Sequence, residues 1–132
     1  FAAKNDSISV ELRSSRFLAK RHKLAYNKPD KNKTYRFIEK IDGRDFWGTD
    51  GEMPRRAVSQ LNMSFKGKPV AIPVTAYNDL YEPRFSTLTV SIAPDNTIYI
   101  ELDNSDGAGA YTIIWVIKGG VYQYRYLDNS NV

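Results

Sequence analysis

The sequence predicts an all-β fold, an antiparallel β-sandwich or flattened barrel built from hairpins. At least six short segments alternate apolar and polar residues, which is typical of half-buried strands. Turn-forming residues separate these segments at short intervals, and no long amphipathic helical pattern occurs between them. The 132 residues are enough to bury a core without disulfides. We expect residues 1–132 to form a single β domain in which residues 13–33 are a peripheral basic segment.

The N-terminal elements are two predicted strands separated by a polar stretch. Residues 7–13 alternate strictly, and the side chains expected to face inward are Ile8, Val10 and Leu12. Residues 14–26 fit either a short helix or an irregular strand. Residues 27–33 are polar and contain a proline, which predicts a turn. Residues 35–41 alternate again and predict the second strand.

A long loop follows at residues 42–56. It is rich in charge and interrupted by glycines, and loops of this length in compact domains tend to be functional or disordered. Phe46 and Trp47 argue against disorder, because large aromatic side chains usually find a pocket. We expect both rings to close one end of the β core, with Trp47 also a candidate for contact with a partner.

Two hairpins are predicted in the part of the chain that follows this loop. Residues 61–72 form the first, with a turn at 66–68, and residues 88–102 form the second, with a turn at 94–96. Between them, residues 77–83 resemble a single helical turn that ends before a proline.

The strongest hairpin signal is Gly119-Gly120, because glycines tolerate the positive φ angles of a two-residue turn. Counting outward from this turn predicts the register of the pairs, each of which would add about 0.2–1 kcal/mol. One face would carry Ile117 opposite Tyr122, Trp115 opposite Tyr124 and Ile113 opposite Tyr126. The other face would carry Val116 opposite Gln123 and Ile114 opposite Arg125. We expect this hairpin to lie centrally in the fold.

The net charge of +4 is concentrated in one segment. Residues 13–33 hold eight Lys or Arg against one Asp, whereas the chain from residue 51 onward is nearly neutral. The segment is either a solvated basic face or a contact for an anionic surface. In the second case the contacts would come from Arg16, Lys20, Arg21 and Lys23. Nucleic-acid binding is disfavoured, because few aromatic side chains accompany the positive charges.

Catalytic and metal-binding chemistry has little support in the sequence. The chain has no cysteine and one histidine, which excludes thiolate chemistry and zinc sites built on histidine and cysteine. His22 lies between two basic residues and is expected at the surface. Residues 103–107 match a calcium loop poorly, and residues 107–109 are followed by a strand rather than by a phosphate-binding helix. We expect no catalytic residue, no cofactor and, without a run of about 18 apolar residues, no transmembrane segment.

The segment Ser105–Tyr111, followed by Trp115 and the Lys118-Gly119-Gly120 turn, resembles part of the bacterial lysozyme inhibitors. These are small secreted β proteins of the periplasm or outer membrane, in which a loop of this kind enters the cleft of the enzyme. The resemblance implies that Ser105 and Tyr111 are contact positions and that the chain is periplasmic or secreted, with its signal peptide removed. The Trp-Gly-Thr-Asp-Gly and Asp-Gly-Ala-Gly-Ala-Tyr loops also resemble those of secreted bacterial β-sandwich domains, which implies a fold and a location but no activity.

Two classes of function follow from these features. The first is a non-catalytic binding module of the bacterial cell envelope with a protein or glycan partner, including a lysozyme-type inhibitor that uses loop 103–111. The alternative is a carbohydrate-binding or glycan-hydrolysing domain that uses loop aromatics and carboxylates. Both require loops 42–56 and 103–111 to lie side by side; otherwise loop 103–111 is only a connector. The candidate binding residues are Ser105, Asp106, Gly107, Gly109, Tyr111, Trp47, Asp50 and Tyr81.

Overall fold

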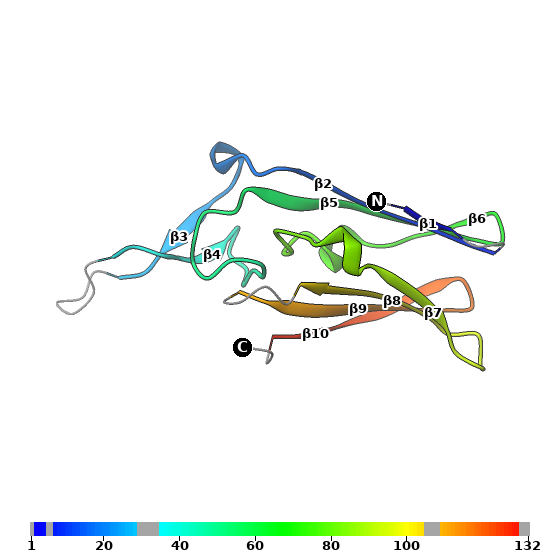
Figure 1. Ribbon diagram of the computed structural model, residues 1–132. Helices are drawn as coiled ribbons and strands as arrows, with labels where there is room; N and C mark the ends of the chain where they lie inside the picture. Colours follow the sequence, from blue (N-terminus) through cyan, green and yellow to red (C-terminus); the bar gives the residue numbers. More distant parts are fainter. Residues whose placement is uncertain (1, 5–6, 29–34, 105–108, 130–132) are drawn as a thin grey trace.

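The computed structural model describes residues 2–4, 7–28, 35–104 and 109–129, and these residues form a β-sandwich (Figure 1). Two four-stranded antiparallel sheets pack against each other, and a two-stranded hairpin extends beyond them at one end. The all-β prediction is confirmed, since 53% of the structure is strand and 8% is helical. Within the described residues the sheets do not close into a barrel, so the sandwich is the correct alternative.

The first sheet has the strand order β1-β2-β5-β6. Its strands are β1 (Ala2–Lys4), β2 (Ile8–Arg16), β5 (Arg56–Phe65) and β6 (Lys68–Val70). β2 pairs with β5 along its whole length, and β5 and β6 form the hairpin predicted at residues 61–72. The buried residues of β2 include the three predicted by the alternation, Ile8, Val10 and Leu12.

The second sheet has the strand order β10-β9-β8-β7. Its strands are β7 (Thr89–Ile92), β8 (Ile98–Asn104), β9 (Tyr111–Lys118) and β10 (Val121–Asp128). The hairpins predicted at 88–102 and around Gly119-Gly120 are both present. The last hairpin is central only in its first strand, because β9 lies inside the sheet whereas β10 is an edge strand.

The predicted register of this hairpin is right at the turn and wrong beyond it. Tyr122 faces Ile117 as expected, but a β-bulge between Tyr122 and Tyr124 shifts the later pairs by one residue. The observed pairs are Val116 with Tyr124, Trp115 with Arg125, Ile114 with Tyr126 and Ile113 with Leu127. A one-residue shift moves side chains to the opposite face. Tyr124 is therefore exposed, whereas Arg125 reaches inward to Asp79.

The sequence left open whether residues 14–26 form a short helix or an irregular strand, and the structure shows their conformation. Residues 14–26 first continue β2, then form a 3-10 turn, η1 (Ala19–Arg21), and then a short strand, β3 (Leu24–Tyr26). β3 pairs with β4 (Ile38–Ile41), which is shorter than the strand predicted at 35–41. The β3–β4 hairpin projects to the left of the sandwich in Figure 1.

The chain crosses between the sheets through two 3-10 turns, η2 (Val74–Ala76) and η3 (Phe85–Thr87). The helical turn predicted at 77–83 is wrong, because η2 ends before it and two of its residues form isolated β-bridges with distant parts of the chain. Leu80 bridges to Trp47, and the following residue bridges to the start of β5. These tertiary backbone contacts outweigh the weak local helical preference.

Two clusters of buried apolar side chains stabilise the fold. The larger lies between the sheets and includes Trp115, which is 0% exposed. The smaller consists of Phe17, Ile38, Ile41 and Tyr81. Trp47 packs against the larger cluster and Phe46 against the smaller one, so loop 42–56 closes one end of the core as predicted. No helix in the described part of the chain has the length and apolar character needed to span a bilayer.

Candidate binding site

The described parts of the two glycine-containing loops lie side by side. The backbone N–H of Gly48 donates a hydrogen bond to the carbonyl oxygen of Gly109 at 3.1 Å. Both residues have positive φ angles, and neither site has room for a side chain. A Cβ atom at Gly109 would lie 2.6 Å from the carbonyl carbon of Thr49, and one at Gly48 would lie 2.1 Å from the carbonyl oxygen of Tyr81. Glycine is required at both positions because the backbones approach so closely.

A hollow of about 480 Å³ opens where these loops meet the start of β5. We call it the end hollow. Three basic and three acidic side chains contribute to its lining, and they are Arg55, Arg56, Arg84, Asp50, Glu52 and Glu82. Five of them are exposed and Glu82 is partly buried. The hollow is therefore a charged surface depression rather than an apolar cavity.

Glu82 has a structural role in the wall of the end hollow. Its Oε1 atom accepts hydrogen bonds from the backbone N–H groups of Arg55 at 2.7 Å and Arg56 at 2.8 Å. Its own N–H donates to the carbonyl oxygen of Arg56 at 3.0 Å, in a backbone with φ of 53°. These bonds connect the crossing segment to the first residue of β5. They fix the backbone from which the side chains of Arg55 and Arg56 extend.

The three arginines differ in how far their side chains are already engaged. Arg56 donates from Nε to the hydroxyl of Ser14 at 2.8 Å and from Nη2 to its carbonyl oxygen at 3.1 Å. Arg55 and Arg84 form no side-chain hydrogen bond or ion pair with any residue that the structure describes. Their guanidinium groups therefore keep their donors for solvent or for a partner.

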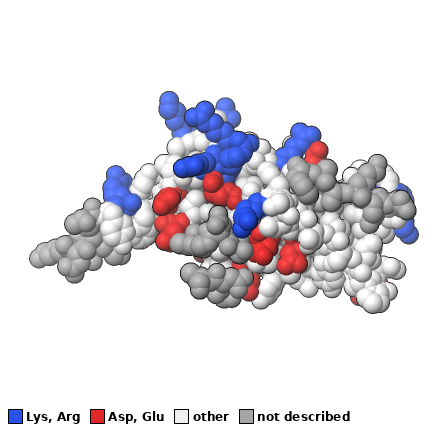
Figure 2. All heavy atoms as spheres, viewed as in Figure 1, with Lys and Arg blue, Asp and Glu red and all other residues white. Residues whose placement is uncertain are grey.

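Strand pairing brings part of the basic segment to the same place. Arg16 at the end of β2 faces Arg56 directly across the β2–β5 ladder, and the N–H of Phe17 donates to the carbonyl oxygen of Arg55 at 2.8 Å. Like charges directly opposite each other destabilise a sheet. Lys20, Arg21 and Lys23 are exposed in the turn that follows. Figure 2 shows Lys and Arg side chains gathered above a band of Asp and Glu.

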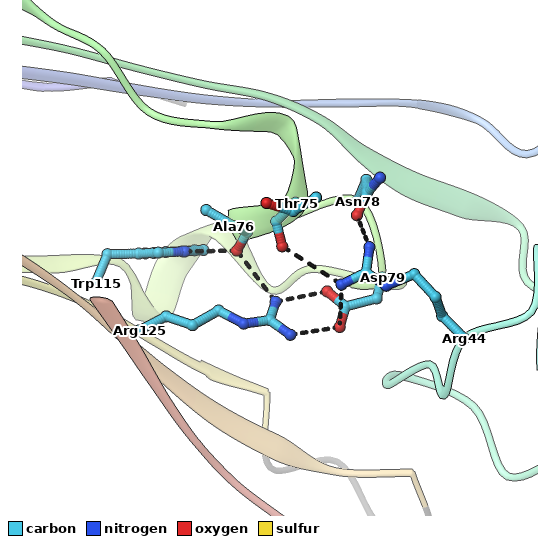
Figure 3. A network of polar contacts seen from close by, with 7 residues as sticks. All are labelled: Arg44, Thr75, Ala76, Asn78, Asp79, Trp115 and Arg125. Atoms are coloured by element: carbon cyan, nitrogen blue, oxygen red, sulfur yellow. Dashed lines mark hydrogen bonds and ion pairs between the residues drawn. The ribbon is translucent and has the colours of Figure 1, made fainter. Parts of the chain in front are cut away.

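A buried polar network holds the crossing segment against the second sheet (Figure 3). Arg125 donates to both carboxylate oxygens of Asp79, at 2.6 and 2.5 Å, and this pairing raises the pKa of Arg125. Trp115 Nε1 donates to the carbonyl oxygen of Ala76 at 2.8 Å. The carbonyl oxygen of Asp79 then accepts the N–H of Trp47 at 3.0 Å. The β-bulge in β10 thus indirectly positions the loop beside the end hollow.

His22 and Asp42 form a separate surface pair. His22 Nδ1 lies 2.7 Å from Asp42 Oδ2, and its ring stacks on Phe17 with centroids 4.6 Å apart. The hydrogen bond from His22, helped by the N–H of Lys23, lowers the pKa of the Asp42 carboxyl group. His22 is thus engaged in local structure, and no group of metal-ligating side chains occurs among the residues with described positions.

The predicted site residues have different fates. Tyr81 and Tyr111 are buried, at 2% and 1% exposed, so in this structure neither side chain presents a surface to a partner. Tyr111 donates its hydroxyl to the carbonyl oxygen of Tyr81 at 3.1 Å, and burial raises the pKa of Tyr81 to about 12 and that of Tyr111 further. The spacing of the glycines before Tyr111 does not reveal that the tyrosine side chain points into the core.

The other candidate residues fall into three groups. Some line the end hollow, one packs against the core, and some lie outside the described residues. Asp50 and Gly109 line the end hollow, and Trp47 is half-buried against the main core. The remaining candidates lie outside the described residues, and they are Ser105, Asp106 and Gly107. The sequence analysis missed Arg55, Arg56 and Arg84. The only signal for the first two was their adjacency at the end of loop 42–56, and Arg84 has no such signal. No protein-family model, curated protein or solved structure matches this chain, so the functional argument depends on the arrangement of its own residues.

Proposed function

We propose that this chain is a non-catalytic binding module and that its partner presents anionic groups to the end hollow. The observation that carries the proposal is the pair Arg55 and Arg84, whose donors have no partner in the described structure. A guanidinium group matches carboxylate and phosphate oxygens with two parallel hydrogen bonds. The cross-strand pair Arg16 and Arg56 adds positive charge at a cost in sheet stability, which an anionic partner would offset.

The acidic residues support binding rather than catalysis. Glu82 already accepts two backbone hydrogen bonds and is fixed in the frame. Asp50 and Glu52 are exposed, whereas a general acid for glycan hydrolysis needs an environment that shields its carboxyl group from solvent. The same carboxylates surround the arginines and would repel a polyanion that approached without matching charges, so they contribute selectivity.

The proposal includes a periplasmic or secreted location, where the partner would be an acidic protein or an anionic polymer of the cell envelope. The inhibitor hypothesis belongs to the same class. It depends on the resemblance of Ser105 and Tyr111 to the contact positions of lysozyme inhibitors. Because Tyr111 is buried, only Ser105 of these two positions remains a candidate for direct contact.

A charge-matched pair of variants tests the proposed function. Arg55→Gln/Arg84→Gln removes two positive charges from the end hollow, and Lys68→Gln/Lys118→Gln removes two from exposed strand ends at the opposite end of the sandwich. Binding to immobilised heparin and to poly-glutamate would be measured over a range of salt concentrations. We expect the arginine variant to elute at lower salt than the parent, while the lysine variant elutes close to the parent.

Two outcomes would contradict the proposed function. Equal loss in both variants would mean that only net charge matters, because both lose the same charge. Retention that does not change with salt would exclude an ionic contact, since such contacts release counterions and weaken as salt rises.

A further inference from the structure

We infer that a second hollow, between the β3–β4 hairpin and segment 46–53, is a binding site for neutral saccharide rings. Its volume is about 870 Å³, within the range of ligand sites. We call it the aromatic hollow because four aromatic side chains line it, and they are Tyr26, Tyr35, Phe37 and Phe46. The two hollows share Thr49, Asp50, Glu52 and Met53. The test of the aromatic hollow nevertheless uses its aromatic rings and not the arginines of the end hollow, so its outcome can be told apart from that of the proposed function.

Two of the four aromatic rings, Tyr26 and Tyr35, are exposed, and Phe37 and Phe46 are partly buried. Tyr35 is 63% exposed and Tyr26 is 37% exposed, in contrast to the fully buried tyrosines of the core. The rings of Tyr35 and Phe37 lie 5.8 Å apart between centroids, and the guanidinium carbon of Arg36 lies 4.2 Å from the centroid of the Tyr26 ring. An exposed aromatic face offers apolar contact area with little conformational freedom to lose. The C–H face of a pyranose ring is a chemical match for such a surface.

Buried groups hold this wall in place before a ligand arrives. Asn27, which is 8% exposed, accepts the N–H of Phe37 on Oδ1 at 2.8 Å and donates from Nδ2 to the carbonyl oxygen of Tyr35 at 3.3 Å. Its own N–H donates to the carbonyl oxygen of Phe37 at 3.0 Å. One side chain thereby fixes the backbone between the two aromatic residues, and a pre-organised site loses less entropy on binding.

The opposite wall is fastened to the hairpin through Gly51. The N–H of Ile38 donates to the carbonyl oxygen of Gly51 at 2.8 Å. Gly51 has φ of +80°, and a Cβ atom there would lie 2.7 Å from Cβ of Phe37. The two walls are therefore in direct contact at the base of the hollow, which makes it a built feature of the fold and not a gap beside a projecting hairpin.

The polar lining favours a neutral polyol over other ligands. One arginine, Arg36, lines the hollow together with three carboxylates, Glu39, Asp50 and Glu52. An excess of negative charge repels phosphate-bearing polymers, which excludes a nucleic acid despite the stacking rings. Carboxylates accept hydrogen bonds from hydroxyl groups, and the arginine donates to hydroxyl oxygens. Aromatic faces surrounded by such acceptors and donors suit a saccharide.

The test uses four neutral oligosaccharides, cellohexaose, hexa-N-acetylchitohexaose, xylohexaose and mannohexaose, titrated into the full chain by calorimetry and by ¹H–¹⁵N NMR. We expect at least one to bind and to shift the amide signals of Phe37, Ile38 and Gly51. Tyr35→Ala should weaken that binding by at least about tenfold, equivalent to about 1.4 kcal/mol. Tyr35→Phe should retain it, because the ring and not the hydroxyl provides the contact. Tyr126→Ala is the matched control, since Tyr126 is also highly exposed, at 59%, but lies on the second sheet.

Three results would overturn the inference. The first is that none of the four oligosaccharides binds at millimolar concentration to a chain whose NMR spectrum shows it folded. The second is equal weakening by Tyr35→Ala and Tyr126→Ala, which would indicate non-specific contact with exposed tyrosines. The third is that a hexaproline peptide, which also stacks on aromatic side chains, shifts the same amides while the sugars do not.

Discussion

Removal of one partner from the Asp79–Arg125 pair should be far more damaging than removal of both. Arg125→Leu takes away the guanidinium that contacts both oxygens of Asp79 at 2.6 and 2.5 Å. The Asp79 side chain is 5% exposed, and Arg44, at 3.4 Å and itself 37% exposed, offsets only part of its charge. Breaking a buried pair from one side costs about 3–5 kcal/mol. Because Arg44 remains, we expect a loss of about 3 kcal/mol in the free energy of unfolding, or about 10 °C in Tm.

Urea denaturation followed by tryptophan fluorescence measures this loss as a lower midpoint at an unchanged m-value. The double variant Asp79→Leu/Arg125→Leu should recover most of the stability, because no uncompensated charge stays buried. Arg13→Leu is the control: its ion pair with Glu11 at 2.8 Å is solvent-exposed, and stability should hardly change. A loss below about 1 kcal/mol in Arg125→Leu, or a double variant as unstable as the single one, would refute the reasoning.

Three further predictions concern the loops and the hairpin. Gly119→Ala should lower the free energy of unfolding by about 1–2 kcal/mol, because it places alanine at a positive φ. Gly109→Ala should cost about 1–3 kcal/mol more, because its Cβ also meets Thr49. Equal losses of the two variants in urea melts would contradict the close approach at Gly109. The pKa of Asp42 is lower in the folded chain, so the unfolded chain takes up the proton first on acidification and stability falls below about pH 4. In melts over a pH series, Asp42→Asn should make the loss of stability at acidic pH less steep. Ser105→Ala/Asp106→Ala should change the free energy of unfolding by no more than about 0.5 kcal/mol. With a lysozyme that the parent inhibits, the double variant should inhibit more weakly, and unchanged inhibition would make loop 103–111 a connector.

Alternation along the chain was sufficient to predict most of the longer strands, whose side chains alternate between core and solvent. The three-residue strand β1 was not predicted, and the segment that contains β3 was left open between helix and strand. β2, β7 and β8 lie where the alternation placed them, and the turns at 94–96 and Gly119-Gly120 join the expected partners. The bulge in β10 was not predictable in this way. It lets Arg125 contact Asp79, which lies 46 residues away in the chain, and no local pattern reveals that contact.

The candidate site was predictable only in outline. Both functional hypotheses required loops 42–56 and 103–111 to lie side by side, and the structure places Gly48 and Gly109 within hydrogen-bonding distance. Arg16 lies beside Arg56 only because β2 pairs with β5. The periodicity of apolar residues along the chain does not reveal which strands pair. The aromatic hollow depends on Asn27, which looks like an ordinary turn residue until its contacts with residues 35 and 37 are seen.

The bulge also affects how this chain can associate with others. An uninterrupted edge strand is a template on which a strand of another molecule can add. Here β10 is the longest edge strand described, and the extra residue after Tyr122 breaks its ladder and increases its local twist. The edges of the first sheet are only three residues long, and β6 contains Pro69, which has no N–H to donate. Strand addition and edge-to-edge aggregation are thus discouraged along these edges.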